Sequence, residues 1–176
     1  LQDLRDDDPE CFKIFLLGLQ TGLRQREIDV ITWRQVNFEK SVIYTETTEH
    51  GHTKSDASES EIDVSPDVMA ILRKFRDGEP QSEFVIRSEV APRPNANYGH
   101  YRCQSIFRRL TAWLRGNGVS THKPLHELRK EFGSQICSTY GIYAASTALR
   151  HASIGVTRDF YLDKKMPFVS PLPKIG

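Results

Sequence analysis

The hydrophobic positions of the chain recur three and four residues apart over much of its length, which is the pattern of helices with one buried face. Asp8-Pro9 is typical of an N-cap followed by proline at the first helical position, and Gly22 is typical of a helix end. These two signals predict a helix between them. Further helices are expected over residues 23–31, 66–75, 103–114, 125–140 and 143–149.

Between residues 36 and 64 the pattern changes to that of strands. Val42, Ile43 and Tyr44 form a run of strand-forming residues, and residues 61–64 alternate between acidic and apolar side chains. We expect a small antiparallel sheet with a polar, loop-like limb at residues 53–60, and another short strand at 84–86. The predicted fold class is α+β and mostly α: a helical domain with the sheet inserted after its second helix.

Composition and charge fit one globular domain. The 176 residues are 38% hydrophobic and 27% charged, with a formal net charge of +1. Binding to nucleic acid would therefore depend on local clusters of basic side chains. Cys11, Cys103 and Cys137 lie far apart, so we expect buried thiols in a reducing compartment. The sequence has no recognisable signal peptide and no apolar run of membrane-spanning length.

The residues with the clearest chemistry lie between Leu125 and Tyr161. His126 and Arg129 are three apart, so on a helix they lie on one side, and His151 precedes Tyr161 by ten residues. A guanidinium binds phosphate oxygens, an imidazole transfers protons near neutral pH, and an activated phenol is a nucleophile. No carboxylate cluster or metal-ligand spacing accompanies this set. It indicates a metal-free site for attack on a phosphodiester.

A second motif, TGLRQREI at residues 21–28, places Arg24 after a glycine turn, with Glu27 one helical turn later. Together with HELR at 126–129, RH at 150–151 and Tyr161, it resembles the tyrosine recombinase (phage integrase) family. The resemblance covers residues 9–161. Each motif alone is common, whereas their order, with a β-hairpin between the first two, is more specific. The chain departs from the family at Arg150, where glycine is usual, and in the spacing to Tyr161, where nine is commoner than ten.

The resemblance implies a role for each residue that would bind the phosphate. Arg24 and Arg129 match the two arginines that clamp the non-bridging oxygens of the scissile phosphate. His126 matches the histidine that handles the nucleophile's proton or orients the phosphate. His151 matches a second histidine, which donates a hydrogen bond to the phosphate.

The resemblance also implies the covalent chemistry. Tyr161 would attack the phosphorus and form a 3′-phosphotyrosyl ester, and Lys54 in the hairpin would protonate the departing 5′ oxygen. Lys40 is a competitor for Lys54, and Tyr140 and Tyr143 are competitors for Tyr161. No metal ion, nucleotide or other cofactor is expected, because the sequence contains no Walker loop and no HExxH motif.

The same resemblance sets expectations for organisation and partners. Residues 1–163 would be the catalytic domain, and residues 164–176 a proline-rich C-terminal tail that docks on a neighbouring protomer. On this expectation, the chain would not include the family's N-terminal core-binding domain. The expected partner is double-stranded DNA, on which the protein would assemble as a tetramer. The expected location is the cytoplasm of a bacterium, with the protein encoded there or by a phage.

Four arginines are expected on the polar half of the helix at 103–114, namely Arg102, Arg108, Arg109 and Arg115. They would either contact the DNA backbone or form a solvated face. Two functions other than recombination also fit the sequence. One is a type IB topoisomerase-like relaxer, which rejoins the same strand. The other is a catalytically silent DNA-binding or assembly module with the same fold.

Overall fold

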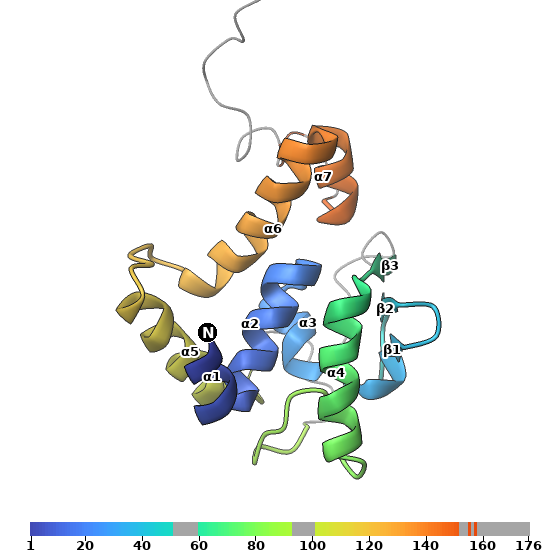
Figure 1. Ribbon diagram of the computed structural model, residues 1–176, viewed down its shortest axis with the longest axis vertical. Helices are drawn as coiled ribbons and strands as arrows, with labels where there is room; N and C mark the ends of the chain where they lie inside the picture. The colour runs from blue at the N-terminus through green and yellow to red at the C-terminus, as the bar shows by residue number, and fades with distance from the viewer. Residues whose placement is uncertain (51–59, 93–100, 152–154, 156, 158–176) are drawn as a thin grey trace, which may run out of the picture.

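The computed structural model describes residues 1–50, 60–92, 101–151, 155 and 157 (Figure 1). Within these residues the chain forms seven α-helices, one 3₁₀ helix and a three-stranded sheet. The elements are α1 (Gln2–Asp7), α2 (Pro9–Thr21), α3 (Gln25–Val30), η1 (Trp33–Gln35), β1 (Val36–Asn37), β2 (Val42–Thr45), β3 (Ser60–Asp63), α4 (Pro66–Gly78), α5 (Gln104–Gly116), α6 (Pro124–Tyr140) and α7 (Ile142–Ala148). The predicted fold class is confirmed. Helix α1 was not expected from the sequence, because its residues are too polar to show a helical hydrophobic pattern.

Helix α2 lies at the centre of the molecule. In Figure 1 it has α5 on one side and α3 and α4 on the other, and α6 and α7 lie over its C-terminal end. Its own ends follow the sequence signals: the Asp8 side chain accepts a hydrogen bond from the Cys11 amide at 3.1 Å, and Gly22 adopts φ 60°. Leu17 is fully buried, and a Cβ on Gly18 would lie only 3.2 Å from Leu128 of α6. This close approach brings α6 down onto α2.

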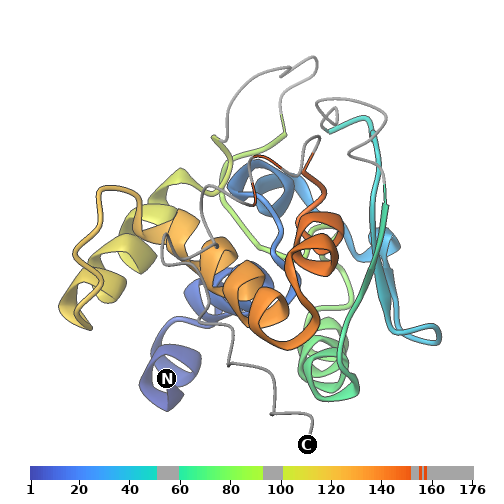
Figure 2. The same cartoon turned by 90° about the horizontal axis from the view of Figure 1, so that it is seen from above.

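The sheet forms one edge of the molecule in both views (Figures 1 and 2). Its strand order is β1-β2-β3 and both pairings are antiparallel, with Ile43 opposite Val36 on one side and Ile62 on the other. These three residues are buried, whereas Glu61 and Asp63 are exposed. The alternation predicted from the sequence therefore gives a sheet with one face on the core.

Two expectations are corrected by the structure. Residues 84–86 form no strand but a single bridge between Phe84 and Thr32, which is closed by a hydrogen bond from the Val85 amide to the Ile31 carbonyl. Cys137 is only partly buried, whereas burial of Cys11 and Cys103 raises the pKa of each thiol to about 12. None of the helices in the described part of the chain is long and apolar enough to cross a membrane.

The turn at Gly22 generates a stability prediction. Gly22→Ala should lower the free energy of unfolding by about 2–4 kcal/mol, because alanine is strained at positive φ and its Cβ would lie 2.4 Å from Cδ1 of Phe132. Gly116→Ala is the matched control, since a Cβ there meets no atom within 4 Å. Urea denaturation of both variants measures the difference. Equal stabilities for the two variants would contradict this account of the turn.

Candidate active site

Arg129 of α6 joins the ends of two other helices. It is 5% exposed, and its guanidinium donates to the carbonyl oxygens of Gly22, where α2 ends, and of Leu149, where α7 ends. A buried guanidinium needs acceptors for its N–H groups, and the carbonyls left unpaired at helix ends supply them. The burial of Arg129 therefore fixes the ends of α2 and α7 against α6.

Arg24 precedes α3 and is held on two sides. Its backbone is extended, with φ −72° and ψ 150°, and its amide donates to Oε2 of Glu27 at 2.7 Å, which is half of a capping box. Its Nη1 donates to Oε1 of Glu27 at 2.7 Å, and its Nη2 donates to the Arg150 carbonyl at 2.9 Å. The Arg24 side chain is still 36% exposed. Its charge therefore remains accessible from the surface.

A reversing turn after α7 presents His151. The Arg150 amide donates to Thr147 at 2.9 Å and the His151 amide to Ser146 at 3.1 Å, and Arg150 has φ 52°. These are the two bonds of a Schellman motif, in which glycine usually occupies the left-handed position. Nδ1 of His151 lies 2.8 Å from the buried Thr157 hydroxyl. This contact fixes the ring.

The charges of these side chains act on one another and on His126, which lies at the start of α6. Burial lowers the pKa of His151 to about 4, helped by the nearby charges of Arg129, Arg24, His126 and Arg150. The pKa of His126 is lowered as well, first by partial desolvation and then by Lys130 and Arg129, although its ring remains exposed to solvent. We call Arg24, His126, Arg129, Arg150 and His151 the basic cluster.

The basic cluster has the chemistry of an anion site with two neutral imidazoles. At neutral pH the lowered pKa values leave both His126 and His151 uncharged, so either can accept a proton or donate an N–H bond. If the Thr157 hydroxyl donates to Nδ1, the N–H of His151 is on Nε2. Arginines of the cluster supply the positive charge. Such a site suits an oxyanion whose charge increases during a reaction.

Two of the expected site residues lie outside the described residues, namely Lys54 and Tyr161. The other four, Arg24, His126, Arg129 and His151, belong to the basic cluster. The sequence interpretation did not assign Arg150 or Thr157 to the site, and it treated Glu27 only as a partner of Arg24. Arg150 carried a signal, because it stands where the resemblance expects glycine.

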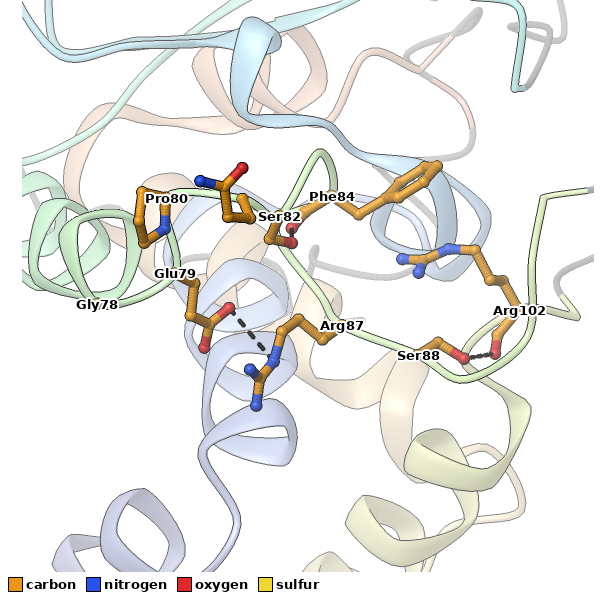
Figure 3. Close-up of a pocket in the computed structure, with 9 residues that line it drawn as sticks. Gly78, Glu79, Pro80, Ser82, Phe84, Arg87, Ser88 and Arg102 are labelled. Atoms are coloured by element: carbon orange, nitrogen blue, oxygen red, sulfur yellow. Dashed lines mark hydrogen bonds and ion pairs between the residues drawn. The ribbon is translucent and has the colours of Figure 1, made fainter.

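The expected position of Arg102 is wrong. It is 2% exposed and lies before α5, where its Nε donates to the Asp29 carbonyl and its Nη2 to the Ile86 carbonyl. Its guanidinium carbon lies 4.0 Å from the centroid of the Phe84 ring, and both residues line a cavity of about 470 Å³. Figure 3 shows the two side chains in this lining. Arg102 has this position because Asp29, also buried, accepts hydrogen bonds from the amides of residues 101–103.

The other three arginines of this group lie on the exposed side of α5. Arg109 pairs with Asp8, with 2.6 Å between Nε and Oδ2. Arg108 and Arg115 line a groove of about 320 Å³ that is bordered by Gln25 and Leu125. In sequence, Gln25 directly follows Arg24, and Leu125 directly precedes His126.

One group in the described residues has side chains of metal-ligand type close together. The ligand atoms of Glu49, His50 and Glu83 lie within 4.8 Å of one another. Nε2 of His50 is 2.9 Å from Oε1 of Glu83, and its ring packs on Phe84 with centroids 4.8 Å apart. A hydrogen bond and ring packing account for this geometry, and the group shares no residue with the basic cluster. We assign no metal to it.

Comparison with solved structures identifies the class of fold. XerA recombinase superposes with a TM-score of 0.68 at 18% identity, over 91% of this chain and 55% of that one. The Tn1549 transposon integrase in complex with transposon right end DNA gives 0.62 at 19% identity, over 88% and 55%. A lambda integrase tetramer bound to a Holliday junction gives 0.65 at 16% identity, over 96% and 47%. The fold is that of tyrosine recombinase catalytic domains, and the chain spans about half the length of these proteins.

The sequence comparison agrees with the structural one. The model of the phage integrase family matches residues 9–166, and the chain belongs to this family. No curated protein matches the chain significantly.

The position of His151 generates a pH prediction. An NMR titration should find its midpoint near pH 4 rather than at the ordinary 6.5, and Arg24→Gln should raise it by removing a neighbouring positive charge. Between pH 6.5 and 4 the histidine binds a proton in the unfolded chain but not in the folded one. The stability contributed by neutral His151 is therefore fully present above pH 6.5. It is lost as the pH falls from 6.5 towards 4. A midpoint near 6.5 in the folded protein would contradict the buried, cation-flanked site.

Proposed function

We propose that the chain is the catalytic domain of a site-specific DNA recombinase or integrase that cuts and rejoins DNA through a 3′-phosphotyrosyl intermediate. One observation supports this most. Arg24 and Arg129, from separate elements, both donate hydrogen bonds to carbonyls at the end of α7, next to His151. Two guanidiniums and an imidazole thus converge on one place, as a phosphate with two non-bridging oxygens requires.

In the proposed reaction the oxygen of Tyr161 attacks the scissile phosphorus and the bond to the 5′ oxygen breaks. His126 takes the proton of the phenol, and Lys54 supplies a proton to the departing 5′ oxygen. Arg24, Arg129 and the N–H of His151 stabilise the charge on the non-bridging oxygens. The phosphodiester energy is kept in the tyrosyl ester, so a 5′-hydroxyl of another strand can reverse the step. Removing one such preorganised donor commonly lowers the rate on the order of 100-fold.

The proposal extends to the DNA and to assembly. Arg108 and Arg115, in the groove bordered by Gln25 and Leu125, would contact the backbone of the bound duplex. Assembly as a tetramer on DNA is proposed from the fold shared with the lambda integrase tetramer bound to a Holliday junction. Docking of residues 164–176 on a neighbouring protomer is part of the same proposal.

The direct test is covalent trapping. The chain is incubated with a pool of nicked and junction duplexes in the presence of EDTA, and adducts are resolved on a denaturing gel. We expect an adduct from the wild-type chain that is lost in Tyr161→Phe, because only the phenol oxygen of residue 161 forms the ester. Tyr143→Phe is the matched control, since Tyr143 is a tyrosine nearby in sequence and is 78% exposed.

The outcomes of this test decide the nucleophile and separate an enzyme from a catalytically silent module. An adduct that persists in Tyr161→Phe, or is lost in Tyr143→Phe, would overturn the assignment of the nucleophile. A wild-type chain that binds the duplexes but forms no adduct would favour the catalytically silent module.

A further inference from the structure

Arg150 is a buried cation at a position that disfavours it. Its side chain is 3% exposed, and its backbone has φ 52°, in the region that favours glycine. Its Nη2 donates to Oε2 of Glu27 at 2.7 Å. Within the described part of the chain, its Nε and Nη1 are buried and have no hydrogen-bond partner. A strained backbone, a desolvated charge and two nitrogens without hydrogen-bond partners all oppose this arrangement, so residue 150 is a candidate for a role beyond packing.

Glu27 connects Arg150 to Arg24. One oxygen of its carboxylate accepts from Nη1 of Arg24, and the other accepts from both the Arg24 amide and Nη2 of Arg150. Arg24 in turn donates through Nη2 to the Arg150 carbonyl. A single carboxylate therefore lies between two guanidiniums, and both the side chain and the backbone of residue 150 contribute to the position of Arg24.

The charges explain why a second arginine matters. If Glu27 paired with Arg24 alone, its charge would neutralise that guanidinium, and an incoming phosphate would have to compete with the carboxylate for it. Because Arg150 balances Glu27, the pair of arginines and one carboxylate keeps a net positive charge. The exposed member of the three is Arg24, at 36% for its side chain, and the buried member is Arg150. The excess charge is therefore available at the surface.

We infer that Arg150 is a positioning residue of the anion site: it neutralises Glu27 and braces Arg24, so that the charge of Arg24 remains available for a phosphate of the DNA backbone. Arg150 acts through Arg24 and Glu27 and does not touch the phosphate. The role assigned to the phosphate rests on the proposed function, whereas the coupling between Arg150 and Glu27 does not.

A double-mutant cycle tests the charge argument. Binding of the chain to a short duplex is measured by fluorescence anisotropy for Arg150→Met, Glu27→Gln and the double variant. We expect Arg150→Met to weaken binding about 10-fold, because Glu27 is then uncompensated, and the double variant to recover most of the loss. Glutamine at position 27 retains an oxygen for the Arg24 amide. A double variant that binds no better than Arg150→Met would overturn the inference.

Two further substitutions at residue 150 separate side chain from backbone. Arg150→Gly removes the charge and relieves the strain of the positive φ. It should bind DNA as weakly as Arg150→Met, although its melting temperature should not be lower than that of Arg150→Met. Arg150→Lys retains the charge and should restore part of the affinity. If Arg150 only fills space, DNA affinity will instead follow the melting temperature through the series. Arg87→Met is the matched control, since Arg87 also pairs with glutamates, Glu10 and Glu79.

The two proposals fail in different ways. Covalent trapping is run on the same variants, with an adduct rate expected to fall in Arg150→Met and to recover in the double variant. If the wild-type chain forms no adduct, the proposed reaction fails while the binding cycle still decides the role of Arg150. If adducts form at unchanged rate in Arg150→Met, the reaction stands and the inference about Arg150 is wrong.

Discussion

The buried guanidinium of Arg129 is the interaction on which the site depends. It donates to Gly22 at the end of α2 and to Leu149 at the end of α7, so three helices distant in sequence meet at one side chain. Arg129 is only 5% exposed, so water contributes little to pairing its guanidinium. The close approach of α2 and α6 at Gly18 and the sharp turn at Gly22 both serve this meeting. The position of the Arg129 guanidinium is therefore set by the carbonyls at the ends of α2 and α7.

Concentrating positive charge in this way is unfavourable because like charges repel, and several groups in the structure reduce this repulsion. Glu27 offsets part of this charge, and the two histidines remain neutral because burial and neighbouring cations lower the pKa of each. Neutral imidazoles add hydrogen-bond donors and acceptors without adding to the repulsion. A phosphate entering the cluster would supply the charge that is missing from the free protein. This explains how a chain with a formal net charge of +1 carries a local cluster of positive charge.

The sequence predicted the features that local chemistry decides. The cap at Asp8, the turn at Gly22 and the alternation along β3 follow from residue type and spacing. It failed for Arg102, because burial of an arginine is decided by acceptors that come from elsewhere, here Asp29 and Ile86. Arg150 stands where the resemblance expects glycine, which marked the position, but its contact with Glu27 could not be read from the sequence because Glu27 comes from α3. The catalytic roles of the expected site residues all remain predictions, namely those of Arg24, Lys54, His126, Arg129, His151 and Tyr161.

Hydrogen–deuterium exchange in Arg129→Met is the most direct test of this account. If Arg129 holds the ends of α2 and α7 together, amides of residues 22–30 and 145–151 should lose protection in concert, while those of β2 and β3 keep theirs. Protection that falls equally over all elements would mean that Arg129 stabilises the domain as a whole. Unchanged protection at both helix ends would show that they meet without it, and either result would contradict the central role given to this guanidinium.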